Sequence, residues 1–319
     1  MSGGPAPRPE PWAPGPRHQA IVGPTASGKS ALALALARRR SDCEIVTVDS
    51  MQVYRGMDIG PAKPTAEEQA EVPHHLLDVV DPDDDYTVSR YQRDCQRVLA
   101  DIEQRGRRGL LVGGTGLYLR AVVDDLDIPG RFPEARAEVE AEPDTEALLV
   151  RLRHLDPVAA GRIEPGNRRR VVRALEVTIG SGRPFSSYGP GLEAYPPAPF
   201  PMAALDIGRD VLDERIARRY EQQVDDGFVV EVRALLDRPA GLSRTARQAL
   251  GYAELLDHLE QGTPLETALE HAVRRTRRFA RRQQRWFARD PRIGWISHDP
   301  DSQDAVENAL VRLDGILGD

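Results

Sequence analysis

Residues 23–30 match the pattern GxxxxGK[ST], in which a glycine-rich turn and a lysine cradle phosphate groups. Glycines let successive backbone N–H groups point at phosphate oxygens, and the N-terminus of the following helix adds partial positive charge. Lys29 would bring a point charge to the terminal phosphate, and the Ser30 hydroxyl could ligate Mg²⁺. A glycine-rich turn that binds nothing is the alternative, and the pattern does not separate a nucleoside triphosphate from a small diphosphate. The expected phosphate-binding residues are Gly23, Pro24, Thr25, Ala26, Ser27, Gly28, Lys29 and Ser30.

Two further polar residues follow strands of the same expected sheet. Asp49 ends the apolar run 44–49, and Thr115 lies among the glycines at 113, 114 and 116. In an open parallel sheet the carboxyl ends of the strands face the ligand crevice. There Asp49 could belong to a Mg²⁺ shell, act as a general base or cap a helix, and its position does not decide among these roles. Thr115 could approach a phosphate closely, or it could belong to a plain strand-to-helix turn.

Alternating strand and helix patterns would position these residues. Apolar runs at 18–22, 44–49, 109–112, 200–207 and 293–297 predict strands. Helical patterns lie between them at 30–40, 86–105, from about 115, 209–226, 246–261 and 264–289, with a last helix after the final strand. This alternation predicts an α/β fold, a P-loop nucleoside-triphosphate-hydrolase-like parallel sheet flanked by helices. Helical patterns at 145–155 and 168–179 predict a mostly helical inserted domain at 125–199, between core segments 18–124 and 200–319.

Length and composition limit the class of protein. A chain of 319 residues that is 40% hydrophobic and 29% charged can form one large domain or two ordinary ones, and it is not a wholly disordered or collagen-like chain. No apolar run approaches the ~20 residues that span a membrane. The proline-rich segment 1–17 is expected to be a disordered leader and not a signal peptide. Cys43 and Cys95 form no CxxC pair, so we expect a reducing, cytoplasmic environment.

Arginine is concentrated in two segments of a chain whose net charge is -7. All of its 43 basic residues except Lys29 and Lys63 are arginines, eight of them in segment 274–289 and four in segment 168–173. Such stripes are typical of contacts with RNA phosphates, and the alternative is a solvated helix face paired with carboxylates. Trp286 and Phe287, within the first stripe, could stack on bases or belong to the core.

Two weaker signals favour structural roles. His74 and His75 are adjacent and therefore point apart on a regular element, and the nearby sequence offers no third metal ligand. The acidic run 81–85 could bind a cation but is more typical of a solvated loop.

An ordered set of motifs resembles the tRNA dimethylallyltransferases, also called tRNA isopentenyltransferases. The motifs are GPTASGKS, DSMQVYRGMDIG with the AKP that follows, PHHL, LVGGTGLYLRA, RVVRALEV and RRQQRWF, and they extend from about Gly23 to Arg289. Only the phosphate loop is diagnostic by itself, but the ordered set is highly specific. Pro61 stands where the family commonly has Thr, and Ala288 separates Phe287 from Arg289 where relatives often have Arg directly after the aromatic residue.

The resemblance implies transfer of a dimethylallyl group from dimethylallyl diphosphate to N6 of adenosine 37, next to the tRNA anticodon. It implies that Lys29 and Thr115 hold the diphosphate, that Asp49 accepts the N6 proton, and that Mg²⁺ is the cofactor, with Ser30 as a ligand. It also favours a monomer, and the lack of an apolar run of spanning length predicts no membrane partner. The residues it assigns to tRNA contact are Asp49, Ser50, Met51, Gln52, Thr115, Arg136, Arg169, Arg170, Arg173, Arg282, Gln283 and Trp286.

Two other functions share parts of this pattern. A P-loop kinase of a small molecule would have the same fold and loop, but it would be expected to carry an arginine-bearing lid and no insertion of this size. A nucleotide-switched RNA-binding module would need a second carboxylate strand for Mg²⁺ and a base-specificity loop. The sequence contains no NKxD-like segment of that kind.

Overall fold

The structure, a computed structural model, describes residues 18–300, 302 and 304–318. The expected leader, residues 1–17, lies outside the described residues. The chain forms two compact units. The first extends to Val123 and resumes at Pro197, and the second is Asp124–Pro196.

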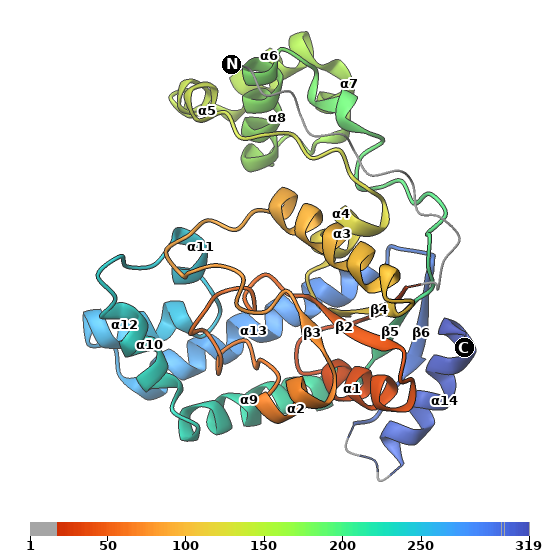
Figure 1. Cartoon of the computed structure of the whole chain (residues 1–319). Coiled ribbons are helices and arrows are strands. Elements are labelled where there is room, and N and C mark those ends of the chain that lie inside the picture. The colour runs from red at the N-terminus through yellow and green to blue at the C-terminus, as the bar shows by residue number, and fades with distance from the viewer. Residues whose placement is uncertain (1–17, 301, 303, 319) are drawn as a thin grey trace. The chain divides into compact units, whose positions relative to one another are not determined.

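The first unit is built on a sheet of six parallel strands in the order β3-β2-β4-β1-β5-β6. This arrangement confirms the predicted α/β fold with a parallel sheet (Figure 1). Strand β1 lies at the centre, with strands of the N-terminal part on one side and strands of the C-terminal part on the other. The strands are β1 Gln19–Val22, β2 Cys43–Val48, β3 His74–His75, β4 Arg108–Gly113, β5 Met202–Asp206 and β6 Ile293–Ser297.

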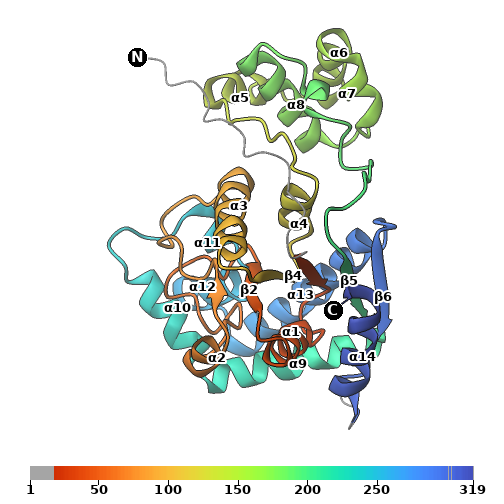
Figure 2. The same ribbon diagram turned by 45° about the vertical axis from the view of Figure 1, so that its right-hand side comes forward.

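Alternate residues of the strands enter two separate hydrophobic cores. Ala20 and Val22 belong to one core, and Ile21 belongs to the other, as the two-residue period of a strand requires. The second core is covered by α1 (Lys29–Arg39) and α14 (Ala305–Leu317). The first core is covered by α3 (Val88–Gln104), α4 (Gly116–Val123), α9 (Arg209–Asp225) and α13 (Leu265–Phe287). Helices α1 and α3 consequently lie on opposite sides of the sheet (Figures 1 and 2).

Some elements of this unit differ from the prediction. The single helix expected at 246–261 is two helices, α11 (Arg244–Arg247) and α12 (Tyr252–Gln261), because Gly251 between them adopts a left-handed φ of 85°. Helices α2 (Ala66–Glu71) and α10 (Phe228–Leu236) and the two-residue strand β3 were not predicted. A two-residue strand is too short for its period to be recognised, and α10 is apolar on most sides.

The adjacent histidines of β3 have structural partners. His74 Nδ1 contacts the Val72 carbonyl oxygen at 2.7 Å, and His75 Nε2 contacts a Glu44 carboxylate oxygen at 2.7 Å. Among the described residues, three or more His, Cys, Asp or Glu side chains nowhere gather as a metal site would need. The described helices include none with the length and apolar character that crossing a membrane requires.

The second unit is a small helical body with its own core. Its helices are α5 (Pro133–Glu140), α6 (Thr145–Leu155), α7 (Pro157–Arg162) and α8 (Arg168–Ser181), followed by the 3₁₀ turn η1 (Phe185–Tyr188). Apolar residues of α5, α6, α7 and α8 pack together, among them Leu148, Leu152 and Leu175. The helix predicted at 145–155 is confirmed, and the one predicted at 168–179 extends two residues further.

Candidate active site

The phosphate loop connects the end of β1 to the start of α1 at the carboxyl edge of the sheet. Gly28 is the N-cap residue of α1 and adopts a left-handed φ of 83°, which a glycine adopts without strain. Ala26 is also left-handed, with a φ of 63°, a conformation unfavourable for a residue with a side chain. Consecutive left- and right-handed residues make backbone N–H groups converge, which is the geometry that binds an anion.

The polar side chains of this loop differ in burial and in hydrogen-bond partners. Lys29 Nζ donates to the Pro24 carbonyl oxygen at 3.0 Å, so the ammonium is folded back over its own loop. Burial lowers the pKa of Lys29 to about 8; the nearby Asp49 carboxylate raises it and the Arg219 guanidinium lowers it. The Ser27 hydroxyl is fully buried and has no hydrogen-bond partner within the described part of the chain. Ser30 is exposed in the first turn of α1.

Asp49 follows the last residue of β2 and caps the turn after it. Its Oδ1 accepts hydrogen bonds from the backbone N–H groups of Met51 at 2.7 Å and Gln52 at 3.4 Å. Its other carboxylate oxygen has no hydrogen bond among the described residues. Strands β1 and β2 both end beside Gly113 of β4, so Lys29 and Asp49 follow strand ends at the same edge of the sheet, and the Asp49 carboxylate raises the pKa of Lys29. One carboxylate oxygen therefore caps the turn, and the other has no hydrogen-bond partner among the described residues.

Thr115 connects β4 to α4 on the same edge. Its N–H donates to the Val48 carbonyl oxygen at 3.2 Å, and its hydroxyl oxygen accepts a hydrogen bond from the Ser50 N–H at 3.2 Å. A hydroxyl that accepts in this way keeps its own hydrogen to donate to an anion. The ends of β2 and β4 are therefore tied together, and Asp49 and Thr115 lie at adjacent strand ends.

Two arginines of α9 support the phosphate loop from the side. Arg215 Nε donates to the Ala26 carbonyl oxygen at 3.0 Å. Arg219 donates to the Thr25 hydroxyl oxygen at 3.1 Å and to the Gly60 carbonyl oxygen at 2.8 Å. Burial lowers the pKa of Arg219, although Asp49 raises it. Sequence reasoning missed both arginines; their four-residue spacing on one helix was the available signal, but the loops that they contact are distant in sequence.

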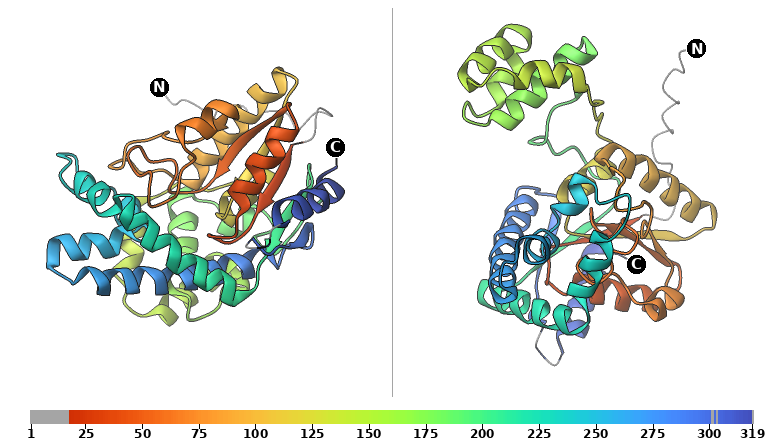
Figure 3. Two further views of the ribbon diagram at one scale, coloured as in Figure 1. Left: turned by 90° about the horizontal axis from the view of Figure 1, so that it is seen from below. Right: turned by 90° about the vertical axis from the view of Figure 1, so that its left-hand side faces the viewer.

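Helix α13 contributes a second support. Gln283 is buried, accepts from the Thr25 N–H at 2.9 Å and donates to the Gly114 carbonyl oxygen at 2.9 Å. The Trp286 indole packs so closely on Gly116 that a Cβ atom there would overlap it. Helices α9 and α13 lie side by side (Figure 3).

The segment after Asp49 is fixed by its own contacts. Gln52 Nε2 donates to the carbonyl oxygens of Pro61 at 3.1 Å and Ala62 at 3.2 Å, and Met51 packs against the first core. Lys63, the second lysine of the chain, donates to the Tyr54 carbonyl oxygen, Asp58 and Asp78 at 2.7, 2.7 and 2.5 Å. This lysine therefore pins the loop structurally.

The arginines predicted for RNA contact differ in exposure and in whether they form ion pairs. Arg282 is exposed, and its guanidinium lies 5.6 Å from the centre of the Phe279 ring. In the second unit Arg169 and Arg170 are exposed and have no side-chain hydrogen bond or ion pair among the described residues. Arg136 and Arg173 instead share the buried carboxylate of Glu176, at 3.4 and 2.6 Å.

The fold and the loop define a P-loop-like α/β protein that carries a lysine, a carboxylate and a hydroxyl at one sheet edge. A sequence profile described as IPP transferase matches residues 52–290, and one described as isopentenyl transferase matches residues 16–79. The chain belongs to the tRNA dimethylallyltransferase family and is a transferase.

Relatives of similar length support this assignment. A tRNA dimethylallyltransferase of Thermobifida fusca is 49% identical over 301 residues, covering 91% of this chain and 92% of the relative. One of Bifidobacterium longum is 47% identical over 287 residues, covering 88% and 86%. A solved tRNA isopentenylpyrophosphate transferase of Bacillus halodurans superposes with a TM-score of 0.67 at 38% identity, covering 94% of this chain and 96% of that one. A solved eukaryotic dimethylallyltransferase acting on tRNA has a TM-score of 0.74 at 25% identity, covering 93% and 77%.

Proposed function

We propose that this protein transfers the dimethylallyl group of dimethylallyl diphosphate to N6 of adenosine 37, next to the tRNA anticodon, and releases diphosphate. The observation that carries the proposal is the meeting of Lys29, Asp49 and Thr115 at one sheet edge in a chain of this family. The leaving diphosphate needs a positively charged partner, and the adenine amine needs a proton acceptor. The cationic loop suits the first, and the carboxylate suits the second.

The phosphate loop would stabilise the leaving group. As the allylic C–O bond breaks, negative charge develops on the diphosphate oxygens. The backbone N–H groups at the start of α1 and the Lys29 ammonium would accept that charge, and the Thr115 hydroxyl would donate from the other side. The unpartnered hydroxyl of Ser27 supports the proposal, because a buried polar group without a partner is costly unless a ligand satisfies it.

The residues present fit a Mg²⁺ ion bound jointly with the substrate. The phosphate loop offers an exposed hydroxyl, Ser30, and the described residues hold no group of three or more His, Cys, Asp or Glu that could bind a metal by itself. Mg²⁺ commonly takes few protein ligands and completes its shell with phosphate oxygens and water. Ser30 would hold it, and the ion would neutralise charge on the diphosphate.

Asp49 would accept the proton of the amine. Adenine N6 forms a bond to the terminal allylic carbon while the carbon–oxygen bond to diphosphate breaks, and the amine must lose one proton. The free carboxylate oxygen of Asp49 can take it, because the other oxygen is occupied in capping the turn. The adenine must first leave the anticodon-loop stack to reach this edge.

The exposed arginines would contact the tRNA backbone. Arg282, Arg169 and Arg170 lack carboxylate partners among the described residues, which favours them over Arg136 and Arg173 as phosphate contacts. On the resemblance to the family, we propose a monomer. We also propose that the protein acts in the cytoplasm, where tRNA substrates are found.

Incubation of the protein with tRNA and either labelled dimethylallyl diphosphate or labelled ATP tests the proposal. We expect label in the RNA from dimethylallyl diphosphate only, with one adenosine per modified tRNA heavier by one C5H8 unit in nucleoside mass spectrometry. Transfer of phosphate from ATP to a small molecule, without modified adenosine, would favour a P-loop kinase and contradict the proposal.

A further inference from the structure

The buried amide of Gln283 joins two loops that follow different strands. Its Oε1 accepts from the N–H of Thr25, in the phosphate loop, and its Nε2 donates to the carbonyl oxygen of Gly114, immediately before Thr115. Both distances are 2.9 Å, and only 7% of the residue is exposed. One side chain of α13 therefore fixes the separation between the loop that bears Lys29 and the turn that bears Thr115.

Hydrogen bonds to two backbone groups fix the orientation of the Gln283 amide. A glutamine has an acceptor oxygen and a donor nitrogen in fixed positions, and here each has a backbone partner. Gly114 provides the space, because a Cβ atom at this position would overlap Nε2 of Gln283. Gly114 has no left-handed backbone angle, so close approach and not backbone conformation requires a glycine there.

We infer that Gln283 is a positioning residue for the diphosphate and not a contact for tRNA. The inference rests on the proposed function, since it assumes that diphosphate lies between the two joined segments. A side chain that is buried and has both polar atoms bonded within the protein has little to offer an RNA. The exposed side chain of Arg282, its neighbour in sequence, is available for that role.

Three variants test the inference. Gln283→Met removes both hydrogen bonds, and Gln283→Glu keeps an acceptor but places a negative charge beside the Gly114 carbonyl oxygen. Gln284→Met is the matched control, because Gln284 is the next residue of α13 and its side chain has no hydrogen bond among the described residues. We expect both Gln283 variants to weaken binding of inorganic diphosphate at least about tenfold by calorimetry, with Glu the more severe, and to raise KM for dimethylallyl diphosphate in parallel.

Affinity for tRNA, measured without diphosphate, separates the two roles of Gln283. We expect it to stay within about twofold of the unsubstituted protein for all three variants, since each leaves the exposed arginines intact. Weaker tRNA binding by the Gln283 variants with unchanged diphosphate affinity would overturn the inference. If the unsubstituted protein itself fails to bind diphosphate, the proposed function fails instead.

Gly114→Ala makes the same test with the glutamine intact, in case Gln283→Met does not fold. The added methyl group should displace the amide and weaken diphosphate binding about as much as Gln283→Ala, a further variant, which removes both hydrogen bonds of the amide. In the Gln283→Ala background the nearest remaining atom is the Gly23 carbonyl oxygen, 3.1 Å from the added Cβ atom, so a small shift accommodates the methyl group and adding Gly114→Ala should cost less than it does in the unsubstituted protein. If the losses of diphosphate affinity in Gly114→Ala and Gln283→Ala simply add in the double variant, Gln283 does not act through Gly114, and the inference is overturned.

Discussion

At the scale of single residues, Asp49 caps a turn with one carboxylate oxygen, and we propose that its other oxygen accepts the N6 proton. Asp49→Asn preserves an oxygen that can accept from the Met51 N–H, so the turn should survive. It removes the charge and the basicity of the second oxygen. We expect the single-turnover rate to fall by about 10²- to 10⁴-fold, with diphosphate affinity unchanged or slightly stronger.

Three measurements on the Asp49→Asn variant discriminate among the roles of Asp49. Rescue of the rate by higher Mg²⁺, with weaker diphosphate binding, would indicate a metal ligand. A lower melting temperature with a nearly normal rate would indicate that capping is the whole role. A rate within about threefold of the unsubstituted protein would contradict proton acceptance by Asp49.

The pKa of Lys29 predicts how diphosphate binding depends on pH. Burial depresses the pKa of its ammonium to about 8, so the charge is lost as pH rises through that value in the unliganded protein. An arginine keeps its charge. The affinity of the protein for inorganic diphosphate, divided by that of Lys29→Arg, should therefore be constant below about pH 7 and fall above about pH 8. Because diphosphate itself titrates in the same way in both measurements, its titration cancels in the ratio. A ratio that stays constant up to about pH 10 would contradict this prediction.

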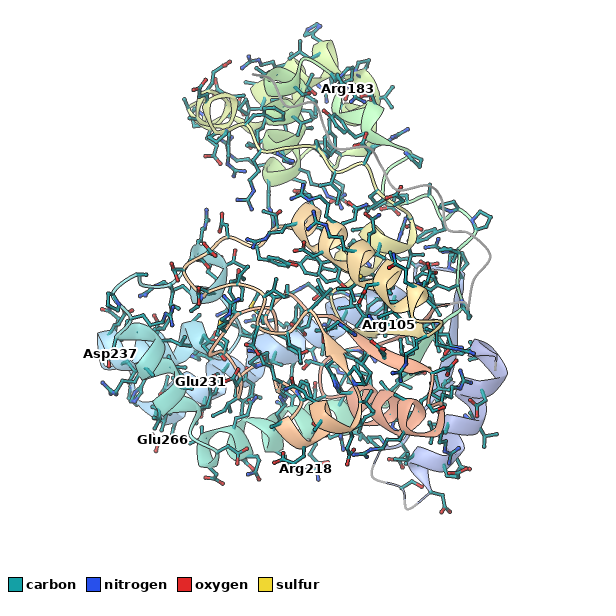
Figure 4. All side chains as sticks on the ribbon, in the orientation of Figure 1. Arg105, Arg183, Arg218, Glu231, Asp237 and Glu266 are labelled. Carbon is teal, nitrogen blue, oxygen red and sulfur yellow. The ribbon has the colours of Figure 1, made fainter. Side chains whose placement is uncertain are left out.

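At the scale of elements, α10 holds the loop that follows β2. Glu231 on α10 (Figure 4) accepts from the N–H groups of Asp58 and Ile59, both at 2.8 Å, and from the Tyr252 hydroxyl at 2.5 Å. Arg219 links Gly60 of this loop to Thr25 of the phosphate loop. We expect Glu231→Ala to cost about 1–3 kcal/mol of unfolding free energy and to raise KM for dimethylallyl diphosphate.

Glu221→Ala is the control for Glu231→Ala, since Glu221 is exposed and has no side-chain partner among the described residues. Urea unfolding and steady-state kinetics on both variants check the prediction. Equal stability of the two variants would show that the contacts of Glu231 do not hold the loop.

Elements next to a motif could be predicted from sequence, and elements that depend on distant contacts could not. The GxxxxGKS pattern requires a strand before it and a helix after it, which predicts β1 and α1 at nearly their observed bounds. Nothing local marks β3, whose two residues become a strand only by pairing with β2. Gln283 shows the same limit within the site, because its partners Thr25 and Gly114 lie more than 160 residues away in the chain.

At the scale of the whole molecule, an acidic protein with local arginine stripes should bind tRNA with a steep salt dependence. Each arginine–phosphate contact on single-stranded RNA contributes about -0.7 to the slope of log affinity against log salt. Neutralising Arg169, Arg170 and Arg282 together should reduce the slope by about 2 if all three contact phosphates. Affinity for dimethylallyl diphosphate should not change.

The control neutralises three arginines that are engaged in ion pairs, Arg38 with Glu71, Arg97 with Asp94 and Arg151 with Glu138. It makes the same change in net charge but should leave the slope nearly unaltered. Filter binding of tRNA at several salt concentrations gives both slopes. A flat salt response of the unsubstituted protein would mean that the stripes do not contact RNA.

The single-turnover rate of Lys29→Ala tests the central claim most directly. That claim is that the phosphate loop holds the leaving diphosphate during prenyl transfer to tRNA. Lys29 lies in the loop and near Asp49, whereas the arginine stripes are separate residues. We predict that turnover at saturating dimethylallyl diphosphate is abolished while tRNA affinity largely survives. A variant that retains most of its single-turnover rate would contradict the account.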